Sequence, residues 1–220
     1  PFSMSVDNYA NAWILYQPPL LSFGGAGKIY QASTVDATCV GTSYVAGAIN
    51  GFDLFGMGFV ADTSGSSQET LFVTGGPYST ATSPSSNANL GSMKTTGLTL
   101  TKIATLTGNM GLPELTGTGT GELWGFYPSA FPPVVGQIDK TTGAILQSHD
   151  LSSLSVGGAM SYAFAAWGGD FYLFLKSTGD LSTNIWKVNG ATGDASQVIT
   201  NSGYSIVGAG VSTCAPSGLP

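Results

Sequence analysis

The chain has 220 residues, of which 42% are hydrophobic, 11% are aromatic, only 8% are charged and 32 are glycines. A disordered chain is poor in apolar residues and rich in charge, so this composition excludes disorder, and no apolar run approaches the roughly 20 residues of a membrane-spanning helix. The six basic residues are all lysines, against twelve carboxylates. This balance argues against nucleic acid as a partner, because phosphates require clustered positive charge.

The predicted elements are short strands, since no long segment carries the 3.6-residue apolar period and the caps of a helix. In chain order they form four similar units, each with a strand of small residues, an aromatic strand and a strand–turn–strand. The small-residue strands are predicted at residues 3–7, 55–60, 115–121 and 162–168. The aromatic strands follow at residues 11–16, 69–74, 122–127 and 170–175. Their central aromatics recur at intervals of 59, 52 and 48 residues, which is the size of a four-stranded propeller blade.

The last two strands of each unit are joined by a turn, which is clearest in residues 136–146. There Asp139 can bond local amides and Gly143 tolerates the positive φ of a tight turn. The run Ile138–Gly143 resembles the outer hairpin of quinoprotein-type β-propeller repeats. This resemblance implies a propeller fold but no quinone cofactor, because the tryptophans that dock such repeats are not visible. The related turns lie in residues 29–38, 91–100 and 187–193.

The sequence therefore predicts an all-β, four-bladed β-propeller that forms a single domain over residues 1–220. Glycine is expected on the inner strands because they converge on an axis with little room for side chains. Residues 206–213 read as a fifth inner strand, so residues 204–220 are predicted to close the ring by docking on the first blade. Alternatively, this segment belongs to a five-bladed propeller or is a strand given to a neighbouring copy. A β-sandwich is the alternative fold, because the repeat interval is irregular.

The two cysteines, Cys39 and Cys214, lie near opposite ends of the chain. In a chain rich in Ser, Thr and Gly they predict one disulfide, formed where the closing segment meets the first blade. This favours an extracellular or cell-surface location. The chain starts at Pro1 without an initiator methionine or a signal pattern, so we expect either a removed signal segment or a fragment boundary.

No catalytic, cofactor-binding or metal-binding residue is predicted. His149 is the only histidine, which leaves no base for a nucleophilic triad, and no Cys-x-x-Cys or calcium-loop pattern occurs. The candidate ligand-binding mouth consists of Asp7, Asp53 and Glu114, which the repeat alignment places at or near the starts of inner strands. Capping of turns is the favoured interpretation of these residues, and paired carboxylates for glycoside hydrolysis are the alternative.

The small number of charges favours a non-enzymatic structural or adhesive protein that associates with copies of itself into a fibre, layer or other homo-oligomeric assembly. The alternative is a lectin-type propeller that binds glycans, and an enzyme acting on glycans ranks third. A lectin would stack sugar rings on aromatic side chains. Those expected at the surface are Tyr9, Tyr16, Tyr78, Tyr127, Phe131 and Tyr204.

Overall fold

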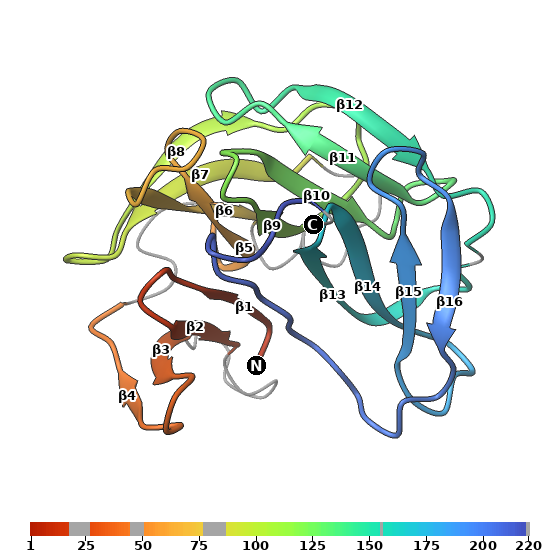
Figure 1. Cartoon of the computed structure of the whole chain (residues 1–220), viewed down its shortest axis with the longest axis horizontal. Helices are drawn as coiled ribbons and strands as arrows, with labels where there is room; N and C mark the ends of the chain where they lie inside the picture. The colour runs from red at the N-terminus through yellow and green to blue at the C-terminus, as the bar shows by residue number, and fades with distance from the viewer. Residues whose placement is uncertain (18–26, 45–50, 77–86, 155, 219–220) are drawn as a thin grey trace.

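The computed structural model describes residues 1–17, 27–44, 51–76, 87–154 and 156–218. The strands within them form four antiparallel four-stranded sheets, and no helix occurs in these ranges, so none that could cross a membrane. Figure 1 shows the sheets as blades around a common centre. The predicted four-bladed β-propeller is confirmed, and the sandwich and five-bladed alternatives are set aside.

Each blade is built from four consecutive strands, paired in chain order. The first blade contains β1 (Ser3–Val6), β2 (Asn11–Tyr16), β3 (Lys28–Ser33) and β4 (Cys39–Gly41). The second contains β5 (Leu54–Ala61), β6 (Glu69–Gly76), β7 (Asn89–Lys94) and β8 (Thr99–Thr105). The third contains β9 (Glu114–Gly117), β10 (Leu123–Tyr127), β11 (Val134–Ile138) and β12 (Ile145–Asp150). The fourth contains β13 (Ala159–Trp167), β14 (Asp170–Ser177), β15 (Asn184–Val188) and β16 (Ala195–Ile199).

The first strands of the blades are innermost, and β5 contacts both β1 and β9 there. Glycine makes this contact close. A Cβ built on Gly117 of β9 would lie 2.0 Å from the carbonyl oxygen of Phe59 on β5, and one on Gly58 would lie 3.2 Å from the Cα of Thr116. Neither position has room for a side chain, so the two backbones pack directly against each other, as expected for strands near a propeller axis.

Aromatic and aliphatic side chains fill the spaces between adjacent blades. Trp13 of the first blade packs edge-on against Phe59 of the second, with ring centroids 6.3 Å apart. Trp124 of the third blade lies 4.7 Å from Phe171 of the fourth. The repeating aromatics are therefore core residues, except in the fourth blade, where Tyr172 is only half-buried and its neighbour Phe171 occupies the core.

The outer turns have the predicted chemistry. Asp139 accepts hydrogen bonds from the backbone amides of Thr141 and Thr142, each at 2.8 Å, and Gly143 closes the turn with φ of 72°. A hydrogen bond from the Thr141 hydroxyl, together with these amide bonds, lowers the pKa of Asp139 to about 2. The fourth blade repeats the pattern with Asn189 as the acceptor.

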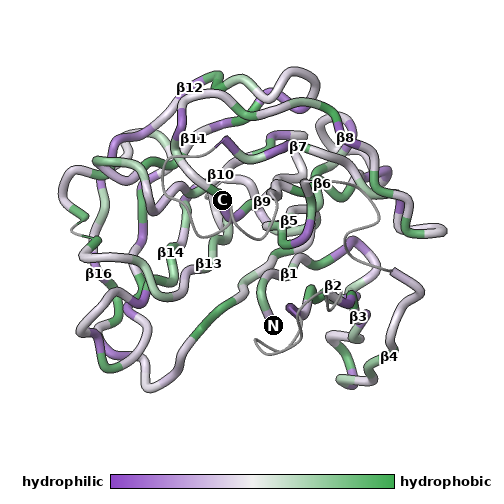
Figure 2. Tube along the Cα trace, turned by 180° about the vertical axis from the view of Figure 1, so that it is seen from behind, coloured by the Kyte–Doolittle hydropathy of each residue, from purple (hydrophilic) through white to green (hydrophobic). Residues whose placement is uncertain are grey.

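The closing segment runs from the fourth blade to the first and then to the inner end of the second (Figures 1 and 2). Tyr204 accepts a backbone hydrogen bond from Thr183, and a Cβ on Gly210 would lie 2.8 Å from the Cα of Ser5. Thr213 then donates a hydrogen bond of 2.6 Å to Glu69 at the start of β6. The segment thus packs against the first blade but forms no strand within residues 204–218, unlike the predicted fifth inner strand.

The predicted disulfide is not formed, because Cys39 and Cys214 are both free and exposed. Cys39 begins β4, the outer strand of the first blade. The bond from Thr213 to Glu69 instead holds the residue before Cys214 at the inner end of the second blade. The closing segment passes the first blade at its inner strand and never reaches the outer edge where Cys39 lies.

The exposure of Cys39 and Cys214 predicts that both thiols react in the folded protein. A thiol reagent added to the folded protein without reductant should label Cys39 and Cys214, and Cys39→Ser should halve the signal. Absence of labelling before reduction, followed by labelling after it, would show that the two residues are bridged.

The inner-strand contact predicts a steric cost at Gly117. Gly117→Ala should lower the free energy of unfolding by about 3 kcal/mol, at the upper end of overpacking costs, because its Cβ would collide with the Phe59 carbonyl. Gly157→Ala is the control, since nothing lies within 4 Å of its Cβ position, and should change stability by less than about 0.5 kcal/mol. Equal denaturation midpoints for the two variants would contradict the proposed contact.

Candidate functional site

Three inner strands meet at the carboxyl group of Glu114, the first residue of β9. Its Oε1 accepts a hydrogen bond from the Ser3 hydroxyl of β1, and that hydroxyl accepts one from the backbone amide of Met57 on β5 at 3.0 Å. Gly56 makes the meeting possible, because a Cβ there would lie 3.2 Å from Glu114 Oε2 and 2.6 Å from the Pro113 carbonyl oxygen. The side chain of Glu114 is only 3% exposed.

Burial determines the protonation of this group. Desolvation raises the pKa of Glu114 well above its ordinary value, and the hydrogen bonds from Ser3 and Met57 oppose that shift only in part. The only ion pair among the described residues joins Lys187 to Asp170, so no lysine in those ranges compensates a charge on Glu114. The fold therefore favours a neutral carboxylic acid at this position, which is a proton donor.

Two tyrosines frame the same end of the inner strands. Tyr162 of β13 donates a hydrogen bond of 3.0 Å to the carbonyl of Leu112, and burial raises its pKa, with a smaller contribution from the charge of Glu114. Burial also raises the pKa of Tyr44 to about 12, with a smaller contribution from Asp53. Asp53 directly precedes β5, so it stands at the same end of the inner strands as Glu114.

Asp7 does not join this group. It follows β1 rather than preceding it, and therefore lies at the opposite end of the inner strands. Its Oδ1 accepts hydrogen bonds from the amides of Tyr9 and Asn11, and its Oδ2 accepts one of 2.9 Å from the Trp13 indole. Asp7 thus caps the β1–β2 turn, and of the three predicted mouth residues only Asp53 and Glu114 share one end.

The sequence analysis missed Ser3. Ser3 and Ser5 alternate along β1, and both hydroxyls accept amide hydrogen bonds from the facing strand β5. That alternation, with period two, is the signal that could have indicated inward-facing hydroxyls. The partner carboxyl is 111 residues away in the chain, so no local pattern could reveal the pair.

A cavity of about 570 Å³ lies beside the same end, between the loop after β10 and the loop before β13. Phe131, which is fully exposed, is among the residues that line it. Tyr9, Tyr16 and Tyr204 are also exposed as expected, whereas Tyr127 is buried in the core and Tyr78 lies outside the described residues. Within the described ranges, no group of three or more His, Cys, Asp or Glu side chains could hold a metal ion.

Comparison with known proteins identifies the fold but no family. No family model and no curated protein matches the sequence. The chain is similar in structure to TolB from Acinetobacter baumannii, with a TM-score of 0.51 and 12% identity over 90% of this chain and 43% of that one. It is also similar to the exo-β-1,3-galactanase of Phanerochaete chrysosporium, with a TM-score of 0.60 and 8% identity over 89% of this chain and 48% of the other.

An exo-1,5-α-L-arabinanase from a bovine ruminal metagenomic library matches with a TM-score of 0.50 and 10% identity, over 91% of this chain and 78% of its own. The chain thus spans less than half of TolB and of the galactanase. These likenesses show the β-propeller class.

The comparisons correct the functional prediction. A non-enzymatic structural or adhesive role, with a lectin as the alternative, was inferred from the scarcity of charge. The solved structures that share the fold instead include glycan-cleaving enzymes, the galactanase and the arabinanase among them. The scarcity of charge misled because glycoside hydrolysis needs only a pair of carboxyl groups, so a low total of charged residues does not argue against an enzyme.

The buried acid predicts how stability depends on pH. A carboxyl whose pKa is raised on folding stabilises the fold fully below its unfolded pKa, and that contribution is lost as the pH rises through the folded-state pKa. Relative to Glu114→Gln, the wild type should therefore lose free energy of unfolding as the pH rises above about 4.5. Urea denaturation across this range measures the difference, with the exposed Asp194→Asn as the control that should follow the wild type. Parallel curves for Glu114→Gln and wild type would contradict a buried neutral acid.

Proposed function

We propose that this chain is a glycoside hydrolase domain in which Glu114 donates a proton to the glycosidic oxygen. The observation that carries the proposal is the buried carboxyl of Glu114 at the start of an inner strand, whose pKa burial raises well above its ordinary value. An acid of this kind, raised in pKa by a dry environment, is what protonation of a leaving group at neutral pH requires. The glycan-cleaving activities of structures with the same fold support the assignment.

Glycoside hydrolysis also needs a second carboxylate. Asp53 is the candidate, because it stands at the same end of the inner strands and its charge acts on Tyr44 nearby. In the proposed reaction Glu114 gives its proton to the departing sugar oxygen as the glycosidic bond breaks. Water attacks the sugar carbon, and the carboxylate of Asp53 takes the proton that this water loses.

The cavity beside Phe131 supports a sugar polymer as the substrate. Its volume of about 570 Å³ lies in the range typical of ligand sites, and its lining carries no charged side chain. An exposed aromatic ring offers an apolar face on which a sugar ring can stack. Extracellular or cell-surface glycans would be the matching substrates, and the expected location of the protein stays a prediction.

The test is hydrolysis of polymeric galactan, arabinan and xylan, followed as the release of reducing ends. The wild type should cleave at least one polymer, and Glu114→Gln and Asp53→Asn should each lower kcat at least about 100-fold, as expected for loss of a general acid or base. Asp194→Asn, in an exposed turn, should leave the rate unchanged. The rate should also fall as the pH rises through the pKa of Glu114.

A Glu114→Gln variant that still cleaves and keeps the wild-type pH dependence of the rate would show that another group donates the proton. A wild-type protein that releases no reducing ends from any of the three polymers would overturn the proposal.

A further inference from the structure

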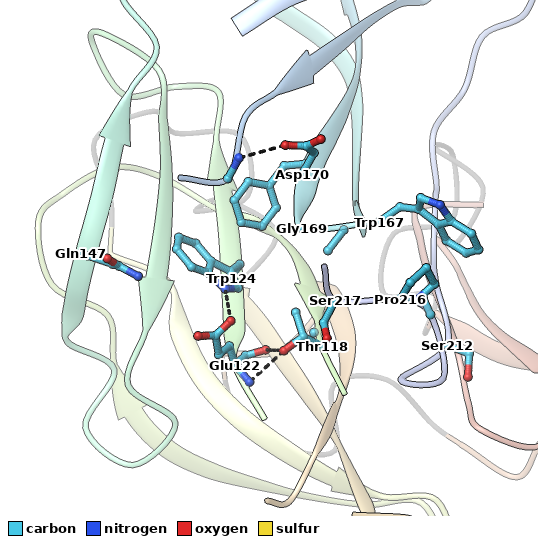
Figure 3. A pocket seen from close by; sticks show the side chains of 15 residues that line it. Thr118, Glu122, Trp124, Gln147, Trp167, Gly169, Asp170, Ser212, Pro216 and Ser217 are labelled. Atoms are coloured by element: carbon cyan, nitrogen blue, oxygen red, sulfur yellow. Dashed lines mark hydrogen bonds between the residues drawn. The ribbon is translucent and has the colours of Figure 1, made fainter. Parts of the chain in front are cut away.

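A second cavity, of about 200 Å³, lies at the opposite end of the inner strands from Glu114 (Figure 3). The β9–β10 hairpin, the β13–β14 hairpin and the closing segment between residues 212 and 217 form most of its walls, and Gln147 of β12 and Gly190 complete them. It is smaller than the roughly 300–1,000 Å³ pockets of drug-sized ligands. Its size suits a ligand of about one sugar ring.

The walls of this cavity are aromatic on one side and rich in hydrogen-bond acceptors on another. Trp124 and Phe171 form the aromatic part, with ring centroids 4.7 Å apart. The carboxylate of Glu122 accepts a hydrogen bond of 3.4 Å from the Trp124 indole, and the backbone amide of Glu122 donates one of 3.1 Å to the Thr118 hydroxyl (Figure 3). Glu122 is half-buried, and none of the lining residues is a lysine.

The closing segment supplies the remaining wall and is firmly attached there. The amide of Gly168 donates a hydrogen bond of 2.8 Å to the Pro216 carbonyl, and Thr213 is bonded to Glu69. Ser212 and Ser217 add hydroxyl groups to the lining. A cavity whose walls are held by hydrogen bonds from separate blades is formed before a ligand arrives, which reduces the entropic cost of binding.

We propose that this cavity binds a single neutral sugar residue, at a site separate from Glu114, and this inference rests on the proposed function, which assigns hydrolysis to that carboxyl group. Sugar hydroxyls are donors that match the carboxylate of Glu122, the amide of Gln147 and the hydroxyl of Thr118. The apolar face of a sugar ring matches the aromatic wall. The carboxylate of Glu122 repels anions, and no lysine lines the cavity, since Lys187 lies outside the lining and is paired with Asp170. The site gives the domain a second point of attachment to its glycan.

The test is titration of the full chain with galactose, arabinose, xylose and glucose, followed by saturation-transfer NMR and tryptophan fluorescence. At least one sugar should bind with a dissociation constant on the order of millimolar. Glu122→Gln and Gln147→Ala should each weaken binding at least about fivefold, the loss expected for a hydrogen bond within the site. The matched controls are Asp194→Asn and Gln197→Ala, because Gln197 occupies an exposed position on β16 like that of Gln147 on β12.

The variants separate this proposal from hydrolysis at Glu114. Glu122→Gln should keep the wild-type hydrolytic rate on soluble small substrates, and Glu114→Gln should keep the wild-type affinity for the monosaccharide. No detectable binding of any of the four sugars would overturn the proposal. So would binding that Glu122→Gln and Gln147→Ala leave unchanged, or binding that is lost only in Glu114→Gln.

Discussion

The close approach of the inner strands is the constraint on which the rest of the molecule depends. β5 and β9 touch backbone to backbone at Gly58 and Gly117, where a side chain would collide with the neighbouring strand. The same contact leaves space over Gly56 in which the hydroxyl of Ser3 meets the carboxyl of Glu114. The carboxyl is largely desolvated because the strands are so close. The raised pKa of Glu114 is thus a consequence of how the blades pack around the axis.

The few charges of the chain have identifiable positions. Asp7 and Asp139 cap turns, and Asp170 pairs with Lys187 at 2.8 Å. Each of these carboxylates is held by several hydrogen bonds or a cation, so they hold the fold together. In Glu114, desolvation outweighs the hydrogen bonds to the carboxyl and raises its pKa. A low total of charged residues is therefore compatible with acid catalysis, provided that burial raises the pKa of one carboxyl group.

The blade pattern was predictable from sequence because it is local. The spacing of aromatic residues such as Trp13 and Trp124, and the Asp139–Gly143 turn, report on strands that pair with their neighbours in the chain. Local patterns could not show that Cys39 and Cys214 stay unbridged. The position of Cys214 depends on the hydrogen bond from Thr213 to Glu69, which are far apart in the chain. Of the site, sequence identified Asp53 and Glu114 as carboxyls at strand starts. It could not identify the contact with Ser3 or the desolvation, which require the assembled blades.

The path of the closing segment bears on the order in which the domain can assemble. Residues 204–213 connect the fourth blade to β1 and are synthesised after every blade strand. The blades pair strands that are consecutive in the chain, so each can form as soon as its own residues emerge from the ribosome. The junction between the first and last blades has to wait for this segment. Until then the nascent protein is an open arc, and the wall that Ser212 and Pro216 give to the second cavity is the last part of the domain to be completed.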